Sequence, residues 1–384
     1  MILKTRGKCI IENFDYTVGK VVFNEANLDV NSFYVSKDDY VPKKNNFLGV
    51  LTMDASLANE KTICNNIQQI DHLEEGDVIL VNGKGLITTM YRVNSVHNTL
   101  MVTERCNSNC LMCSQPPKDK EDIYLLHEIH KKVIPLIPKD CFELGISGGE
   151  PTLMGNLFID LLKTLKENLP NTHIHVLTNG RTFAWNNLVE KISELQYDKV
   201  MYGIPLYSDY YKMHDYIVQA KDAFHQTILG IHNLARYDLR IEIRIVLHKL
   251  SVERLLELSK YIYKNMPYVE HVAFMGLEYI GYTPHNIEKL WIDPYDYKDV
   301  LSDSVNYLGN KGIRTSIYNS TLCTLNYDSW HYSRKSISDW KNEYLEECNN
   351  CRMLEECGGL FRWNLKKHSN YIKPFSEKIE NIYL

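Results

Sequence analysis

Three cysteines near residue 110 have a spacing that suits a metal centre. They lie in the run Arg105-Cys106-Asn107-Ser108-Asn109-Cys110-Leu111-Met112-Cys113, which has the pattern Cys-x3-Cys-x2-Cys. Thiolates are soft ligands that select zinc or iron–sulfur clusters. A structural zinc site takes four protein ligands, so zinc would need a distant residue to complete this loop. A [4Fe–4S] cube held by only three thiolates keeps one iron open to an exogenous ligand.

A Gly-Gly-Glu-Pro tetrapeptide is the second chemical motif, within Ser147-Gly148-Gly149-Glu150-Pro151. Two glycines let the backbone approach a ligand closely. Glu150 offers an acceptor for an ammonium group, and Pro151 fixes the direction in which the chain continues. Alone, such a tetrapeptide is more often only a turn. Its place one helix and one strand after the cysteine loop favours a shared binding site.

A second group of cysteines lies near the C-terminus. Its members are Cys323, Cys348, Cys351 and Cys357. Four thiolates suffice for a closed tetrahedral zinc site or for a fully ligated [4Fe–4S] cluster, and their chemistry alone leaves both open. The remaining cysteines, Cys9, Cys64 and Cys141, are isolated, and we expect them to be buried small hydrophobic residues.

Composition and charge narrow the class of protein. The 384 residues are 44% hydrophobic and 24% charged, with a net charge of −5, so no basic excess favours nucleic acid or an anionic membrane. No apolar segment follows Met1, and no run reaches the ~18 apolar residues that a spanning helix needs. We therefore expect a cytoplasmic protein. In that compartment, clustered cysteines more often bind metal than form disulfides.

The expected secondary structure, which must position these motifs, changes near residue 95 from mostly β to alternating strands and helices. Residues 1–95 contain short β-type runs separated by Gly, Asn and Asp, which predicts a small, mostly β accessory domain. From about residue 98, strand-like and helix-like segments alternate. The expected strands are Thr99–Thr103, Phe142–Ile146, His173–Leu177, Val200–Leu206, Ile241–Leu247 and His271–Met275. The expected helices are Lys120–Leu136, Asn156–Asn168, Lys221–Ala235 and Ser251–Tyr263.

This alternation predicts an α/β fold whose parallel strands form a partial (β/α)6 barrel through right-handed crossovers. Chemistry in such barrels lies where the strands end. The motifs agree, because the cysteine loop follows the first strand, the Gly-Gly-Glu motif the second, and Thr178-Asn179-Gly180 the third. The expected domains are residues 1–95 for the β domain, 96–310 for the barrel and 311–384 for a cysteine-rich extension.

With these motifs, the core resembles the radical S-adenosylmethionine (SAM) superfamily. The resemblance implies that the three cysteines of the first loop hold a [4Fe–4S] cluster whose open iron binds SAM. It also implies that Gly148, Gly149 and Glu150 border the methionine amino group of SAM. Reductive cleavage of SAM would then give a 5′-deoxyadenosyl radical, with the cofactor carrying the chemistry and the protein positioning it.

Three further polar residues are candidates for contacts. Ser208, just after the fourth strand, stands where family members often contact the SAM ribose. Arg244, within the fifth strand, could meet the SAM carboxylate as a charge-assisted pair. Glu278, after the sixth strand, is a candidate substrate contact. An ordinary structural role is the alternative for each, and for Glu278 we favour that alternative.

The pattern Cys-x2-Cys-x5-Cys-Gly-Gly after the barrel resembles the SPASM/twitch extension of peptide-modifying members. Full SPASM domains continue with Cys-x3-Cys, but the position four past Cys357 is Phe361, and the later cysteines are missing. The resemblance therefore implies the shorter, twitch-like form with one auxiliary [4Fe–4S] cluster. Its ligands would be Cys323, Cys348, Cys351 and Cys357. A zinc site stays the alternative.

A narrower resemblance covers nearly the whole chain. The strings TERCNSNCLMCSQPP, FMGLEYIGYT and SISDWKNEYLEECNNC are similar to the His-Xaa-Ser system radical SAM maturases of the C lineage. That implies a peptide or small-protein substrate with His-Xaa-Ser repeats, a second radical SAM maturase as partner and an external electron donor. The alternatives are a radical SAM enzyme acting on a small molecule, such as a nucleoside or cofactor precursor, and a zinc-stapled binding protein without catalysis.

Overall fold

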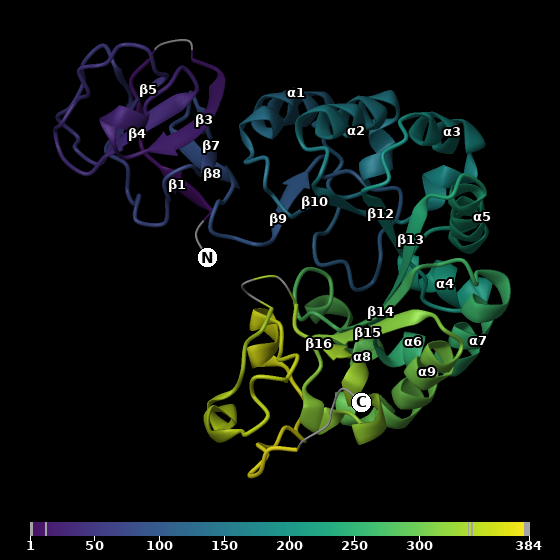
Figure 1. Ribbon diagram of the computed structural model, residues 1–384. Helices are drawn as coiled ribbons and strands as arrows, with labels where there is room; N and C mark the ends of the chain where they lie inside the picture. Colours follow the sequence, from purple (N-terminus) through teal and green to yellow (C-terminus); the bar gives the residue numbers. More distant parts are fainter. Residues whose placement is uncertain (1–2, 12–13, 337, 339–340, 380–384) are drawn as a thin grey trace. The chain divides into compact units, whose positions relative to one another are not determined.

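The computed structural model describes residues 3–11, 14–336, 338 and 341–379 (Figure 1). The chain divides into two compact units. The first contains Met1–Leu100, Ile123–Leu144 and Leu161–Thr172, and the second contains Met101–Asp122, Gly145–Asp160 and His173–Leu384. The boundaries expected at residues 95 and 310 stay a prediction.

A mixed sheet forms the first unit, with eight strands among the residues described, in the order β1-β8-β7-β3-β4-β5-β6-β2. They are β1 Lys4–Arg6, β2 Lys8–Cys9, β3 Tyr16–Val22, β4 Ser32–Ser36, β5 Gly49–Thr52, β6 Thr62–Asn65, β7 Val78–Asn82 and β8 Leu86–Tyr91. β3 to β6 pair in parallel, and the outer strands pair antiparallel. The expected N-terminal β sheet is confirmed.

The core of this unit is apolar, and it includes one of the isolated cysteines. Cys64 is fully buried among Phe33, Leu51 and Ile79, and burial raises the pKa of its thiol to about 12. Cys9, on the edge strand β2, and Cys141 are only partly buried. The expectation of full burial is therefore right for Cys64 and wrong for the other two.

The second sheet follows the order of the chain, from β9 to β16. Its strands are β9 Asn98–Met101, β10 Glu143–Ser147, β11 His173–Leu177, β12 Val200–Pro205, β13 Arg240–Leu247, β14 His271–Gly276, β15 Arg314–Tyr318 and β16 Ser333–Arg334. The pairs from β11 to β16 are parallel. The expected α/β fold is confirmed, and each of the six expected strands is present. Two strands beyond residue 310, β15 and β16, extend the same sheet.

Helices connect these strands, and α5, α7 and α9 run along the outer side of the curved sheet (Figure 1). The α-helices of the described chain are α1 Ile123–Val133, α2 Asn156–Asn168, α3 Asn186–Glu194, α4 Tyr211–Val218, α5 Ala223–Arg236, α6 Lys249–Val252, α7 Leu255–Asn265, α8 Ile287–Leu290 and α9 Lys298–Asn310. The expected helix Ser251–Tyr263 divides into α6 and α7 at Arg254. Across the residues described, no helix combines the length and apolarity needed to cross a membrane.

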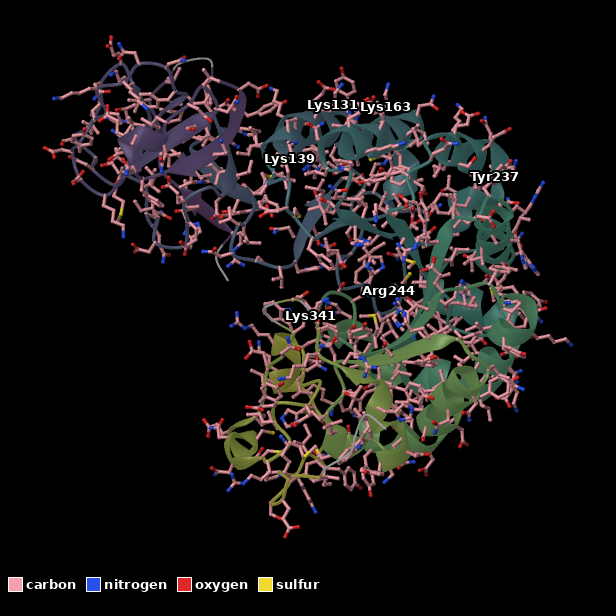
Figure 2. The ribbon with its side chains drawn as sticks, in the orientation of Figure 1. Lys131, Lys139, Lys163, Tyr237, Arg244 and Lys341 are labelled. Carbon is pink, nitrogen blue, oxygen red and sulfur yellow. The ribbon has the colours of Figure 1, made fainter. Side chains whose placement is uncertain are left out.

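Strand β13 shows how the sheet separates an apolar face from a polar one. Ile241, Ile243 and Ile245 are at most 1% exposed, and they alternate with Glu242 and Arg244. Side chains two residues apart on a strand share a face, so the charged pair lies opposite the isoleucines. One face of β13 thus packs apolar side chains, and the other, on which Figure 2 labels Arg244, carries charge.

Candidate metal and cofactor site

A buried carboxylate holds the residues just before the first cysteine loop. Asp122, 3% exposed, accepts hydrogen bonds from the Thr103 hydroxyl at 2.7 Å and from the Glu104 backbone N–H at 2.9 Å. The Thr103 hydroxyl in turn accepts from the Arg105 N–H at 3.1 Å. These bonds fix the three residues that precede Cys106.

Two other segments hold the rest of the loop. The N–H groups of Asn109 and Leu111 donate to the last carbonyls of α4, at 3.0 and 2.9 Å. The Cys113 carbonyl accepts from the Tyr282 N–H at 2.9 Å, in the loop after β14. The cysteines are therefore presented by a loop whose backbone is tied on both sides.

Arg181 is a further anchor that our sequence analysis missed. Its Nη1 donates to the Asn107 carbonyl and to Ser108 Oγ, the latter at 3.1 Å. Its Nε donates to Gln226 Oε1 at 2.8 Å. The signal in the sequence was its position directly after Thr178-Asn179-Gly180, at the end of the third strand.

The structure brings the three thiols together, and their chemistry fits a ligand set. Cys110 interacts electrostatically with both Cys106 and Cys113. Burial raises the pKa of all three thiols, to about 11 for Cys106. A raised pKa is the opposite of what an activated nucleophile needs. A metal ion, in contrast, displaces the thiol proton when it binds.

The surroundings of Cys106 also suit an iron–sulfur cluster. The Ser108 N–H and the Asn179 side-chain amide point to its sulfur, at 3.4 and 3.9 Å, and such bonds tune cluster potentials. Three soft thiols from one loop fit a [4Fe–4S] cube with one iron free of protein ligands. Within the described ranges, no three His, Cys, Asp or Glu side chains are arranged to hold a single metal ion.

The two glycines after β10 let that strand end run against the cysteine loop. A Cβ on Gly148 would lie 2.4 Å from the Thr103 carbonyl oxygen, and one on Gly149 would lie 2.0 Å from that of Arg105. The Gly149 N–H donates to the Thr103 carbonyl at 2.8 Å. Close approach to the loop thus explains both glycines, and their contact with SAM stays a prediction.

Glu150 is fully buried and links the ends of two strands. Its Oε1 accepts from the Thr152 N–H at 3.0 Å and from the hydroxyls of Thr152 and Thr178, each at 2.6 Å. Its Oε2 accepts from the Asn179 N–H at 2.6 Å. Burial raises the pKa of Glu150, and these donors oppose the rise. Among the described residues, Oε2 has one donor where Oε1 has three, so Oε2 keeps more capacity to accept a further hydrogen bond.

Two substitutions of Glu150 separate its structural role from ligand binding. Glu150→Gln retains one carbonyl acceptor, and we expect SAM affinity to fall about ten- to a hundred-fold because a charge-assisted hydrogen bond is lost. Glu150→Ala leaves four buried donors without their acceptor, so it should also lower the thermal midpoint. Anaerobic titration calorimetry, iron analysis and thermal unfolding measure these effects. Unchanged SAM affinity in Glu150→Gln would limit this side chain to its structural role.

Ser208 and Arg244 already have protein partners. Ser208 is 1% exposed, and its hydroxyl accepts from the Tyr210 N–H at 3.1 Å. Arg244 donates through Nη1 to Glu242 Oε1 at 2.7 Å and through Nη2 to Met275 Sδ at 2.9 Å. Their contacts with the ribose and the carboxylate of SAM stay predictions.

Glu242 organises a buried polar network that sequence reasoning did not find. Besides Arg244, it contacts His271 Nδ1 at 2.7 Å and His175 Nε2 at 3.3 Å, while His271 Nε2 meets Ser316 Oγ at 3.0 Å. Burial opposes ionisation of Glu242, but Arg244 and the histidines outweigh it and hold its pKa well below its ordinary value. The signal was a charged residue at every second position of an otherwise isoleucine-rich strand.

The C-terminal cysteines meet at one small pocket. Cys323, Cys348, Cys351 and Cys357 all line it. The apolar side chains of Leu322, Met353 and Phe375 line it too. Burial, with smaller contributions from neighbouring Cys323 and Cys348, raises the pKa of Cys357 to about 11. The four thiols line one pocket but, among the described residues, are not arranged to hold a single metal ion, so a cluster or a zinc ion at this pocket stays a prediction.

Comparison with known proteins finds a family match for the central segment. Residues 100–262 match the family model of the Radical SAM superfamily. An uncharacterized protein of Methanocaldococcus jannaschii is 26% identical over 65% of this chain and 82% of its own length. A putative glycyl-radical enzyme activating enzyme of the same organism is 30% identical over 35% of this chain and 34% of its own.

Among solved structures, SuiB of Streptococcus suis bound to S-adenosylmethionine superposes with a TM-score of 0.46 at 16% identity. The superposition covers 58% of this chain and 50% of SuiB, so the chain spans half the length of that protein. The matched family segment begins within β9 and ends within α7, and it contains the cysteine loop, the Gly-Gly-Glu motif and Arg181. Residues 100–262, which carry the motifs described above, are thus similar to the Radical SAM superfamily.

Proposed function

We propose that this protein cleaves SAM reductively and uses the resulting radical to modify a peptide or small protein that carries His-Xaa-Ser repeats. The observation that carries the proposal is the pocket of four cysteines after the segment that matches the Radical SAM superfamily. That pocket supports the resemblance to the twitch extension of peptide-modifying enzymes. The motif strings that resemble His-Xaa-Ser maturases support the choice of substrate.

In this proposal the first loop holds the cofactors. Cys106, Cys110 and Cys113 would bind the [4Fe–4S] cluster. With SAM bound, these cofactors supply a 5′-deoxyadenosyl radical that abstracts hydrogen from the substrate. Arg181 holds the loop backbone in place, and Glu150 fixes the strand end that would face the SAM amino group.

Apolar side chains beside the cysteine loop would exclude water from the reaction. Leu111, Met112, Tyr207 and Leu277 form a buried cluster against which Cys110 packs. A radical formed in water-accessible space reacts with the wrong partners, so this cover protects the productive reaction. The auxiliary centre would carry electrons to or from the substrate radical, or hold the small extension folded.

Co-expression with a small protein that carries His-Xaa-Ser repeats tests the proposal. We expect mass spectrometry to show a mass change in that protein only when this enzyme is present, and none with the Cys106, Cys110 and Cys113 alanine variant. Formation of 5′-deoxyadenosine without any change in the small protein would favour the small-molecule alternative. Zinc without iron, and no 5′-deoxyadenosine, would favour the non-catalytic alternative.

A further inference from the structure

A short N-terminal segment joins the two ends of the first sheet. β1 pairs with β8 at one end of the strand order, and β2 pairs with β6 at the other end. Gly7 alone separates β1 from β2, and its N–H donates to the Gly85 carbonyl at 2.9 Å. The sheet therefore closes on itself through residues 4–9, and the pairing of β2 with β6 is termed the seam.

Two cysteines lie opposite each other at the seam. Cys9 is the register partner of Cys64, and the neighbouring Ile10 N–H donates to the Ile63 carbonyl at 3.0 Å. Hydrogen-bonded and non-hydrogen-bonded pairs alternate along an antiparallel ladder, so Cys9 and Cys64 form a non-hydrogen-bonded pair. The Cα atoms of such a pair are about 4.5 Å apart, and its side chains share a face. A disulfide spans Cα distances of about 4.4–6.8 Å, so this backbone can carry one.

The surroundings leave both thiols free to turn towards each other. Neither forms a disulfide in the structure. The Cys9 thiol contacts the Ile11 carbonyl at 3.8 Å and the Cys64 thiol the Gly85 carbonyl at 4.0 Å. Thiols are weak donors, so rotation about Cα–Cβ gives up little. A Cβ on Gly7 would lie 3.0 Å from the Cys64 sulfur, so the glycine keeps space open beside that thiol.

The two thiols differ in how they meet a reagent from solvent. Cys9 is partly exposed, whereas Cys64 is 0% exposed. Burial also raises the pKa of Cys64 to about 12, which keeps it protonated. A dissolved oxidant therefore reaches Cys9 first, because reactivity follows exposure and thiolate character. Cys64 reacts only with a sulfur brought beside it, and its register partner supplies that sulfur.

We propose that Cys9 and Cys64 form a reversible disulfide that locks the seam under oxidising conditions. With oxidised glutathione as the oxidant, the Cys9 thiolate attacks one glutathione sulfur, the glutathione S–S bond breaks, and one glutathione leaves. The Cys64 thiolate then attacks the Cys9 sulfur and displaces the second glutathione. The protein thiols lose two electrons, the glutathione disulfide gains them, and the two thiol protons end on the released glutathione molecules.

The expected effect of the disulfide is a slower opening of the seam. Cys9 and Cys64 are 55 residues apart in the sequence, and a cross-link over so long a loop strongly restricts the open chain. Disulfides in the cytoplasm are mostly transient, which fits a bond that forms and breaks with the glutathione poise. The pair belongs to neither cysteine group, so this proposal is independent of the function proposed above.

Peptide mapping of the full-length reconstituted enzyme tests the pair. The anaerobic protein is equilibrated with oxidised or with reduced glutathione, alkylated with N-ethylmaleimide in denaturant and digested without reduction. With oxidised glutathione, we expect mass spectrometry to find the Cys9 and Cys64 peptides joined, and excess dithiothreitol to separate them. Hydrogen exchange of residues 4–10 should slow about tenfold in the oxidised form, because exchange there requires the seam to open.

Three variants complete the test. Cys141→Ser, at a partly buried cysteine outside both groups, is the matched control and should retain the cross-link. Cys9→Ser and Cys64→Ala should each lose it, with hydrogen exchange unaffected by glutathione. Should Cys64→Ala fail to fold, Cys9→Ser still decides, because it changes a partly exposed position and leaves Cys64 to be recovered as an alkylated thiol.

Recovery of both Cys9 and Cys64 alkylated after equilibration with oxidised glutathione would overturn the proposal. So would a glutathione adduct on Cys9 with Cys64 still alkylated, because the second exchange step would then not occur. A cross-link that leaves the hydrogen exchange of residues 4–10 unchanged would overturn the locking of the seam.

Discussion

Replacing Cys106, Cys110 and Cys113 together by alanine abolishes formation of 5′-deoxyadenosine from SAM and dithionite, while the metal at the C-terminal cysteines is retained. The expected loss is complete, because without these thiols no cluster is present to reduce SAM. The backbone of the loop is held by Asp122 and Arg181 rather than by the thiols, so the variant should fold. Anaerobic chromatography of the products and iron analysis measure both outcomes.

Cysteines outside the two groups provide the control for this variant. Replacing Cys9, Cys64 and Cys141 by alanine should leave 5′-deoxyadenosine formation unchanged, because none of them belongs to either ligand set. Production at the wild-type level by the Cys106, Cys110 and Cys113 variant would disprove the assignment of the cluster.

Removing the C-terminal thiols should halve the iron content. Reconstituted wild type is expected to contain about eight irons per chain, and a variant with alanine at the four cysteines about four. The variant should also be cleaved faster by protease in this segment. Its regular structure includes short 3₁₀ helices such as Glu346–Asn350 and Arg362–Lys366, and bound metal contributes strongly to the folding of such segments.

The metal found with the wild type decides the role of this second centre. About eight irons would fit one open and one closed cube. Four irons with one zinc would identify a structural zinc site, exclude electron transfer through it and retain only the folding role. A variant that keeps its full iron content would show that these cysteines are not ligands.

The motifs and strands could be predicted from the sequence because the pattern of each lies within a short segment of the chain. The isoleucines of β13 alternate with polar residues, and the cysteine loop and the Gly-Gly-Glu motif follow strand ends, as expected. Arg181 and Glu242 were not found, because their roles come from partners distant in sequence. Glu242 contacts His271, 29 residues away, and Arg181 donates to Gln226, 45 residues away.

The glycines and Glu150 show a second limit of sequence reasoning. Their residue types predicted close approach and a carboxylate acceptor, and the structure has both. The partners it provides are the backbone of the cysteine loop for Gly149 and the end of β11 for Glu150. A motif predicts which kind of contact a residue can make. Long-range packing determines which group in the protein the residue contacts.

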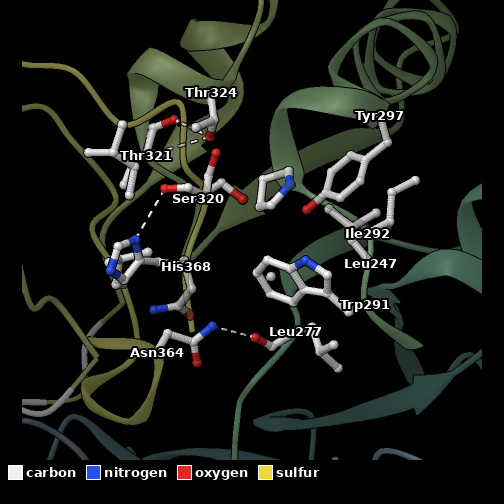
Figure 3. A pocket seen from close by; sticks show the side chains of 16 residues that line it. Leu247, Leu277, Trp291, Ile292, Tyr297, Ser320, Thr321, Thr324, Asn364 and His368 are labelled. Atoms are coloured by element: carbon white, nitrogen blue, oxygen red, sulfur yellow. Dashed lines mark hydrogen bonds between the residues drawn. The ribbon is translucent and has the colours of Figure 1, made fainter. Parts of the chain in front are cut away.

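Asn364 clamps the loop around Glu278, because it donates to the Leu277 carbonyl, 87 residues away in sequence, at 2.8 Å and accepts from the Tyr279 N–H at 3.0 Å (Figure 3). The clamp also completes late during synthesis, because about 250 residues separate Cys113 from Asn364. At about 5–20 residues per second, a ribosome needs roughly 12–50 s to make that stretch. During this interval the cysteine loop has emerged, but the loop that ends on Cys113 is not yet locked. The loop that ends on Cys113 therefore receives its last anchor only after residues 114–363 have been made.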